Sequence, residues 1–296
     1  MLSAVPAAKR PRIPQEPVYQ TPPVAWPTLL LFVLALALWI GALAAALHGL
    51  IPPLAAILLQ TVAAFMQFTV LHDGVHRSLL RGYPRLNDLV TSVAGSFLGL
   101  VGVGPAFRYA HFKHHRLTNE ADDPDQWSGR GLLHCATADV YYGVVILRDW
   151  KAISFKERFQ IAGGVALLLG VFAACVALGH GWDAVLYWLL PARLAILWLA
   201  FAFNYLPHHP HQVEQRHNPY AATNVRRGGE PLMKWLFLYQ NYHLIHHLFP
   251  SVPFYRYLKI WRQNESGFVA QGTNVVPWYG LNPHRPQQAA TTGQTP

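Results

Sequence analysis

Charged side chains are scarce in this sequence. They account for 12% of the 296 residues, whereas hydrophobic residues account for 52%. Soluble domains carry about 25% charged residues, so the composition argues against an ordinary soluble protein. The net charge of +9 comes from Lys and Arg residues that lie between apolar segments. That distribution is typical of the cytoplasmic side of membrane proteins and not of a nucleic-acid-binding surface.

Cysteine and cofactor-binding motifs are also nearly absent. Cys135 and Cys175 are too few for a disulfide framework, a thiolate metal site or an iron–sulfur cluster. The sequence has no Gly-rich dinucleotide fingerprint and no haem or flavin motif. Residues 1–25 are rich in proline and lack the apolar core of a signal peptide. We expect 1–25 and 281–296 to be disordered tails that flank one membrane domain, 26–280.

Long apolar runs are present in that domain. About 20 apolar residues cross a bilayer as a helix, and four runs approach or exceed this length: 26–50, 54–71, 159–178 and 184–206. They predict two transmembrane hairpins in an all-α integral membrane fold. The Gly-rich run 89–107 favours a re-entrant or interfacial helix over a fifth span.

The last run contains an ionisable residue. Arg193 follows Pro191, and an arginine at the centre of a bilayer is costly. We therefore expect this span to begin near Pro191, with Arg193 at the outer interface. The hairpin turns at 48–53 and 180–183 contain no Lys or Arg, which predicts cytoplasmic termini and a cytoplasmic, histidine-rich cap.

Histidine is the abundant polar residue, with 16 copies. Several copies recur at positions i, i+3 or i+4, which share one face of a helix. Isolated histidines near an interface are usually ordinary polar side chains, but repeated clusters at one end of apolar spans predict a metal site. The clusters are His72 and His76; His111, His114 and His115; and His243, His246 and His247.

The number of histidines suggests which metal site this is. Three or four nitrogen ligands satisfy one zinc ion, so eight or nine predict two ions. Imidazole suits Zn, Cu, Fe and Ni. No cluster contains a Glu, which argues against a zinc protease and against a carboxylate-rich di-iron site. A membrane metal transporter would place histidines and acids within the spans, so we keep it as a remote alternative.

The order and spacing of the clusters resemble the membrane fatty acid desaturase and hydroxylase superfamily. Its HxxxH, HxxHH and HxxHH boxes match the three clusters, and the resemblance covers about residues 54–257. Some members of that family add a ligand four residues after an asparagine that holds a water. Asn204 and His208 match this spacing, and His209 and His211 are alternative ligands. The stretch 241–253 resembles the third box of both acyl-lipid desaturases and β-carotene hydroxylases.

The resemblance implies a function and its requirements. Two irons and O2 would oxidise a methylene group of a lipid that arrives from the bilayer. We expect a fatty acid desaturase, with a carotenoid hydroxylase as the alternative. A separate ferredoxin- or rubredoxin-like carrier and its reductase would supply electrons. The basic residues expected to attract that carrier, or to contact lipid headgroups, are Arg81, Arg85, Lys113, Arg116, Arg226, Arg227 and Lys234.

Other polar residues are candidates to orient the ligands. A metal-bound histidine normally donates its second N–H group to a carboxylate or carbonyl. We expect this role, or a role in holding water, for Asn204, Asp73, Asp122, Asp123 and Asn241, and we consider Asp88 and Asp125 as well. Helix capping or loop solvation is the alternative role for these side chains.

Overall fold

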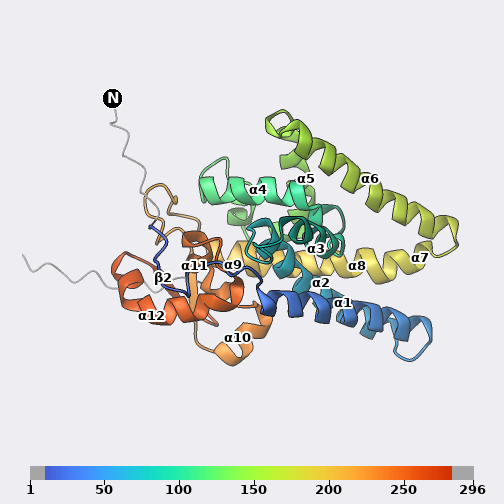
Figure 1. Ribbon diagram of the computed structural model, residues 1–296, viewed down its shortest axis with the longest axis horizontal. Coiled ribbons are helices and arrows are strands. Elements are labelled where there is room, and N and C mark those ends of the chain that lie inside the picture. The colour runs from blue at the N-terminus through green and yellow to red at the C-terminus, as the bar shows by residue number, and fades with distance from the viewer. Residues whose placement is uncertain (1–10, 282–296) are drawn as a thin grey trace, which may run out of the picture.

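The computed structural model describes residues 11–281, which are mainly helical. The long helices lie roughly along one direction, and the C-terminal elements gather at one end of them (Figure 1). The α1–α2 and α6–α7 turns lie at the opposite end. The elements before the last span are α1 (Trp26–Leu47), α2 (Pro53–Val75), α3 (Pro84–Ser96), η1 (Gly99–Gly102), α4 (Gly104–Leu117), η2 (Gln126–Arg130), η3 (Leu132–Thr137), α5 (Ala138–Arg148), η4 (Trp150–Ala152) and α6 (Phe155–Ala177).

Four of the described helices are long and apolar enough to cross a membrane. They are α1, α2, α6 and the continuous helix Gly181–His208, so the predicted number of spans is confirmed. The last helix joins α7 (Gly181–Ala184), η5 (Val185–Leu189), α8 (Leu190–Leu199), η6 (Ala200–Tyr205) and α9 (Leu206–His208), and η5 and η6 are π-helical. The membrane orientation of these spans stays a prediction.

The helix that contains Arg193 begins at Gly181 and passes through Pro191; a membrane boundary near Pro191, with Arg193 at the outer interface, stays a prediction. Arg193 lies inside this helix, and its partners come from the segment where η3 ends and α5 begins. Its guanidinium donates to the carbonyl of Ala136 and lies 3.2 Å from a carboxylate oxygen of Asp139. A paired and hydrogen-bonded arginine is tolerated where an isolated one is not.

The run 89–107 is broken in the middle and forms no long helix. The close approach of Gly95 and Gly102 explains the break. A Cβ atom on either glycine would lie 1.9 Å from the carbonyl oxygen of the other. Gly99, between them, has a positive φ of 61°, which glycine adopts without steric cost. The chain therefore turns back on itself here, and α4 enters the histidine-rich region from a different direction.

The C-terminal elements lie at the histidine end of the long helices (Figure 1). They are β1 (Asn224–Arg227), α10 (Glu230–Leu236), η7 (Gln240–Tyr242), α11 (His243–Leu248), η8 (Phe254–Arg256), α12 (Tyr257–Ala270) and β2 (Asn274–Pro277). The strands pair in parallel, with Asn224 opposite Asn274. The all-α prediction missed this pair, which buries Val225 and Val276 completely.

The described part of the N-terminal segment packs against the domain. We expected residues 1–25 to be a disordered tail, but Tyr19 is 3% exposed and its ring contacts Phe249 edge-on, with centroids 4.9 Å apart. Arg256 donates to the carbonyl of Pro17 at 3.0 Å. Residues 11–25 thereby brace the segment that follows α11. Residues 1–10 and 282–296 lie outside the described residues.

Candidate metal centre

Four helices bring the histidine clusters together. The helix α2 continues beyond its apolar run to Val75, so His72 lies in its last turn and His76 caps it. The second cluster forms the last turns of α4, and the third lies on α11. The third cluster meets the other two through His246, which contacts His72 on α2 and His115 on α4. His208 ends the last span on α9.

The first group of side chains combines all three clusters. Possible ligand atoms of His72, His76, His111 and His246 lie within 4.8 Å of one another. The Nε2 atoms of His72 and His246 are 3.0 Å apart, and those of His76 and His111 are 2.8 Å apart. His115 joins this group, because its Nε2 lies 2.8 Å from that of His246 and 3.1 Å from that of His111.

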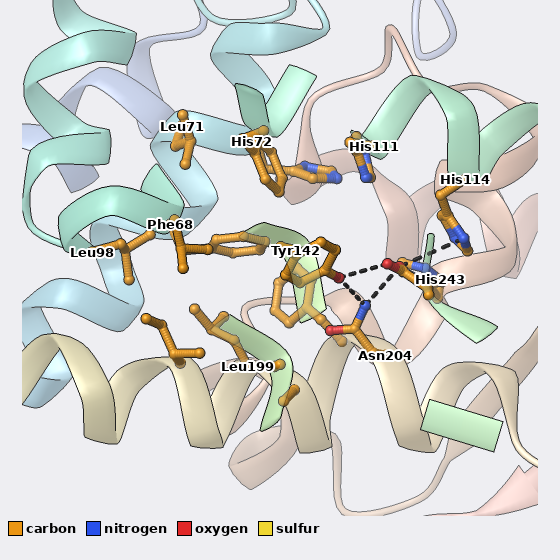
Figure 2. A pocket seen from close by; sticks show the side chains of 17 residues that line it. Phe68, Leu71, His72, Leu98, His111, His114, Tyr142, Leu199, Asn204 and His243 are labelled. Carbon is orange, nitrogen blue, oxygen red and sulfur yellow. Dashed lines mark hydrogen bonds and ion pairs between the residues drawn. The ribbon is translucent and has the colours of Figure 1, made fainter. Parts of the chain in front are cut away.

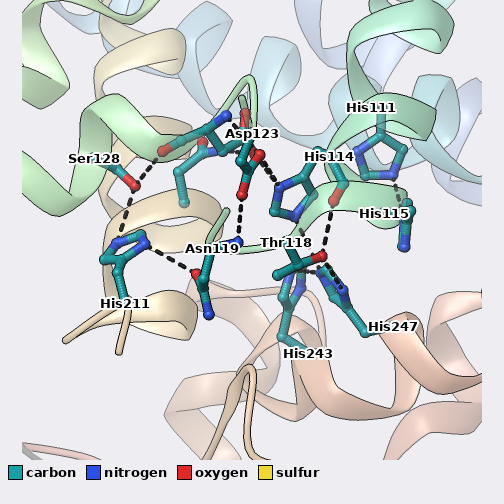
Figure 3. A network of polar contacts seen from close by, with 12 residues as sticks. His111, His114, His115, Thr118, Asn119, Asp123, Ser128, His211, His243 and His247 are labelled. Atoms are coloured by element: carbon teal, nitrogen blue, oxygen red, sulfur yellow. Dashed lines mark hydrogen bonds and ion pairs between the residues drawn. The ribbon is translucent and has the colours of Figure 1, made fainter. Parts of the chain in front are cut away.

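The second group consists of His114, His208, His243 and His247, all buried and within the same 4.8 Å limit. Nε2 of His247 lies 3.2 Å from that of His114 and 3.1 Å from that of His243. The histidines of the second box are thus divided between the groups. Its middle member belongs to the second group, and its first and last members belong to the first (Figure 3).

The geometry fits a metal ion better than hydrogen bonding. Nε2 of His246 lies 3.0 Å, 2.8 Å and 3.3 Å from the Nε2 atoms of His72, His115 and His111. A neutral imidazole nitrogen carries one hydrogen or one lone pair, so one atom cannot form three such hydrogen bonds. Two nitrogens bound to one zinc ion at about 2.0–2.1 Å lie roughly 2.9–3.4 Å apart, which is close to the separations found here.

Ring nitrogens without hydrogen-bond partners and lowered pKa values of the histidines support the same conclusion. His208 is 3% exposed, and within residues 11–281 neither of its ring nitrogens has a hydrogen-bond partner. Burial, followed by the neighbouring histidines, lowers the pKa values of His111, His243, His246 and His247 well below the usual range. Those rings are therefore neutral, the form that binds metal. Each group fits one transition-metal ion.

Polar side chains contact the Nδ1 atoms of several of these histidines and so fix the orientation of the rings. His114 donates from Nδ1 to Asp123 at 2.8 Å (Figure 3), which is the contact that we expected for this aspartate. Three partners were not anticipated. His243 donates to Gln240 at 3.1 Å, His247 to Gln215 at 3.2 Å, and Nδ1 of His246 lies 3.2 Å from the Tyr257 hydroxyl. Gln240 precedes His243 by three residues, a helical spacing that was a usable signal.

The other candidate acids take different positions. The Asp73 carboxylate accepts from the Thr28 hydroxyl at 2.9 Å and lies 3.8 Å from Nδ1 of His72. Asp122 is exposed, whereas Asp123 and Asp125 are buried. Asp88 pairs with Arg77 at the surface. Asp73 and Asp123 thus lie beside ligand candidates, whereas Asp122 and Asp88 point outward.

Two asparagines that we singled out hold different parts of the site. Asn241 donates to the carbonyl of Arg226 at 3.0 Å and so ties the third cluster to β1. Asn204 donates from its amide nitrogen to Asp125 at 2.6 Å and contacts the Tyr142 hydroxyl at 3.0 Å (Figure 2). Tyr142 in turn donates to Asp125 at 2.5 Å. Asn204 reaches the cavity beside the second histidine group.

The alternative ligands His209 and His211 lie outside both groups. His211 contacts Asn119 through Nδ1 and Ser128 through Nε2, each at 3.2 Å (Figure 3). Its burial lowers its pKa to about 4. The ring of His209 packs against Tyr205, with centroids 5.0 Å apart. Of the three neighbouring histidines, His208 is the one that faces the other rings of the second group.

A narrow cavity touches both groups. Its volume is about 40 Å³, enough for a few water molecules. His72 and His111 of the first group and His114 and His243 of the second line it (Figure 2). The remaining wall is mainly apolar, with Phe68, Leu71, Leu98, Val101, Phe107, Ala138, Ile196, Leu199, Ala200 and Phe203. An apolar group in this cavity would lie next to both candidate metal positions.

Internal contacts occupy three of the seven basic residues that we expected at a docking surface. Lys113 lies 2.7 Å from the Asp149 carboxylate, Arg227 pairs with Glu265, and Arg226 is 4% exposed. Lys234 is half-buried. Arg81, Arg85 and Arg116 remain exposed.

Comparison with known proteins gives two kinds of relatives. A β-carotene ketolase of Paracoccus sp. (strain PC1) is 29% identical over 192 residues, which cover 64% of this chain and 71% of the ketolase. An sn-1 oleoyl-lipid 12-desaturase of Arthrospira platensis is 25% identical over 266 residues, which cover 78% of this chain and 73% of the desaturase. The fatty acid desaturase family model matches residues 49–278. These residues include both histidine groups, and the chain belongs to the fatty acid desaturase family of membrane oxidoreductases.

Proposed function

We propose that this protein uses two irons and O2 to oxidise a methylene group in the acyl chain of a membrane lipid, as a desaturase. The narrow apolar cavity that contacts both histidine groups carries this proposal. An unactivated hydrocarbon chain offers no charge or hydrogen bond for recognition, so the shape of an apolar wall must position it.

The ligand assignment follows the two groups. His72, His76, His111, His115 and His246 would hold one ion, and His114, His208, His243 and His247 the other. Bound iron would supply the redox chemistry with O2 that an unactivated C–H bond requires. Contacts such as those of Asp123, Gln240 and Gln215 would fix the orientation and tautomer of the rings.

Asn204 has a separate role in this proposal. Asp125 and Tyr142 hold its amide nitrogen on the side of the second histidine group (Figure 2), so a rotation of the amide would be needed to present its carbonyl oxygen there. An oxygen acceptor there would hold a water beside the second ion, as the family pattern implies. The apolar side chains opposite Asn204 would exclude further water from the cavity.

The shape of the cavity favours an acyl chain over a ring. Phe68 and Phe107 contact each other edge-on, with centroids 5.4 Å apart, and Phe107 stacks on His111 at 5.1 Å. Phe203 also contacts Phe68 edge-on at 4.8 Å. Because these rings contact one another, we propose that the cavity accepts a slim chain and that a methylated ring would require them to move.

A carotenoid substrate is the second candidate. The observation in its favour is that the β-carotene ketolases reach 29% and 30% identity to this chain, above the 25% of the Arthrospira desaturase. The same histidine groups would serve hydroxylation of a carotenoid ring. A metal transporter is less compatible, because both groups lie at one end of the long helices, with no second set along the described spans.

The proposal also includes a membrane orientation and an electron donor. We place the termini and both histidine groups on the cytoplasmic side, since the α1–α2 and α6–α7 turns lack Lys and Arg. A separate ferredoxin- or rubredoxin-like carrier with its reductase would deliver electrons. The exposed Arg81, Arg85 and Arg116 are positioned to attract an acidic carrier or anionic headgroups.

The test is expression in a bacterial host whose membranes contain both β-carotene and defined acyl lipids. Fatty acids are analysed by gas chromatography and mass spectrometry, carotenoids by liquid chromatography, and metals in the purified protein by plasma mass spectrometry. We expect about two irons per chain and a new double bond in an acyl chain. A change confined to the carotenoids would select the second candidate, and one zinc per chain would refute the di-iron site.

Single-residue variants provide the matched control. His246→Ala removes a ring from the centre of the first group, and we expect loss of both iron and product. His180→Ala removes an exposed histidine at the opposite end of the helices, and we expect no effect on either. Equal loss in the two variants would show that iron binding does not depend on the groups described above.

A further inference from the structure

A second apolar cavity adjoins the one at the histidine groups. Its volume is about 520 Å³, within the range of about 300–1,000 Å³ that is typical of ligand pockets. It lies between η1, α4, α5 and the first half of α6. Val101, Phe107 and Tyr142 line both cavities. The two spaces are therefore neighbours, separated by those three side chains.

The outer cavity lies at the depth of the lipid chains. Ile161, Ala162 and Val165 form its wall on α6. They lie two to six residues after Phe159, where the apolar run of that helix begins, which is about 3–9 Å along the helix axis. Hydrocarbon chains surround a membrane protein at that depth, whereas water-soluble molecules do not enter it.

The outer face of α5 supports an opening toward lipid. Val140, Val144 and Leu147 are 68%, 54% and 74% exposed and follow a spacing of four and three residues, so they share one face of the helix. Leu100, on the same cavity, is 51% exposed. Such a row of large apolar side chains is stable in contact with acyl chains and not with water.

A hydrogen bond and a ring stack fix two of the three side chains that separate the cavities, Tyr142 and Phe107. The Tyr142 hydroxyl donates to Asp125 at 2.5 Å, which anchors the ring from one side. Phe107 stacks on His111 with an interplanar angle of 12°. Figure 2 shows Tyr142 beside Asn204, with His72 and His111 on the other side of the inner cavity. A chain that passes this point reaches both histidine groups.

The largest apolar cavity described near the spans does not have this connection. It measures about 650 Å³ and is lined by α1, α3, α6 and the α7–η5 region, with His180 and Asp183 at one end. None of its lining residues belongs to the inner cavity. Volume alone would select this site, but continuity with the histidine groups selects the cavity between α5 and α6.

We propose that the lipid chain reaches the histidine groups sideways from the bilayer, through the cavity between α5 and α6, and that Val101, Phe107 and Tyr142 form the constriction that it threads. This inference rests on the proposed function, because it assumes a lipid substrate. It adds the route between α5 and α6 and the three residues of the constriction that select for a slim chain.

Two glycines offer a matched test. Gly143 lines the outer cavity, and a Cβ atom built on it meets no other atom within 4 Å. The Cβ atom of Gly143→Phe is therefore accommodated, and its ring would add bulk to the cavity. Gly163 on α6 has equally open surroundings but does not line the cavity, so Gly163→Phe is the control. Ala162→Phe fills the same cavity from the opposite wall.

We expect Gly143→Phe and Ala162→Phe to lower the turnover of a long-chain lipid in vesicles by about tenfold or more, since extra bulk in a filled cavity is strongly disfavoured. Gly163→Phe should stay within about twofold of the wild type. Iron content and thermal unfolding should be unchanged in all three. Wild-type turnover in both cavity variants, or equal losses in the control, would overturn the proposed route.

Photo-crosslinking tests the route without turnover. A phosphatidylcholine with a diazirine in its acyl chain is irradiated with the wild-type protein in vesicles, and the labelled peptides are identified by mass spectrometry. We expect label within 139–150 and 161–165, reduced in Gly143→Phe. Label confined to α1 and 183–188, or absent from α5 and α6, would refute the route. If this label forms but no lipid is oxidised, the proposed function fails and the route stands.

Discussion

Asp123 provides the sharpest test of how the second group is held. Its carboxylate is 3% exposed and accepts three N–H groups: Nδ1 of His114 at 2.8 Å, the backbone N–H of Asp125 at 2.9 Å, and that of Asn119 at 2.8 Å. In Asp123→Asn, one oxygen remains for His114 and Asp125. The new amide group then faces the N–H of Asn119, so two donors oppose each other.

The size of the effect follows from these contacts. A buried donor without an acceptor costs about 1–3 kcal/mol. Loss of a partner that orients a ligand histidine lowers metal affinity by about 10–100-fold. The Asp125 carboxylate lies 3.5 Å from Nδ1 of His114 and preserves part of the electrostatic attraction. We therefore expect the affinity of the second group for iron to fall by a factor nearer to ten than to one hundred.

The assay is an iron titration of metal-free protein at buffered free-iron concentrations, with bound iron counted by mass spectrometry. At limiting iron, the variant should hold about one ion per chain where the wild type holds about two. Asp122→Asn, which changes the exposed neighbouring carboxylate, is the control and should titrate as the wild type does. Unchanged affinity in Asp123→Asn, or an equal loss in Asp122→Asn, would refute the reasoning.

Two further predictions concern the other histidines. Tyr257→Phe removes the hydroxyl beside His246, so we expect about tenfold weaker iron binding in the first group, whereas Tyr255→Phe should have no effect; equal behaviour in an iron titration would contradict this. Burial keeps the pKa values of several histidine rings below the unfolded-state value of about 6.5. Below that pH the unfolded chain binds protons that the folded protein does not bind. The free energy of unfolding of the metal-free protein therefore falls as the pH drops, by up to about 1.4 kcal/mol per pH unit for each ring. The midpoint of thermal unfolding of iron-free protein in micelles should therefore fall between pH 7.5 and pH 5.5. A constant midpoint would count against neutral rings. The rings concerned are His111, His243, His246 and His247.

The sequence predicted those features of the protein that depend on local spacing. Apolar runs near the length of a bilayer became four long helices, and histidines at helical spacing became faces of α2, α4 and α11. Asp123 was within reach of prediction because it follows the second box by a short loop. Each of these inferences used residues close together in the chain.

Features that depend on distant parts of the chain were not predicted. The division of the second box between two groups depends on how α11 packs against α4, which no local pattern records. Gln215 contacts the backbone carbonyl of His115, 100 positions earlier, at 2.7 Å, and also reaches His247. The contact between Arg193 and Asp139 was not anticipated, because Asp139 lies on another element. The β1–β2 pair joins segments 50 residues apart.

The π-helical segment η6 has a consequence for the length of the last long helix. A π turn contains one more residue than an α turn and is common at functional sites, and η6 carries Asn204 and precedes His208. A deletion within η6 would remove this extra residue and return the turn to regular α-helical hydrogen bonding. The backbone around Asn204 would then change, and with it the direction in which its side chain leaves the helix toward Asp125 and Tyr142. The length of this turn, as well as its residue types, therefore sets where Asn204 lies in the cavity.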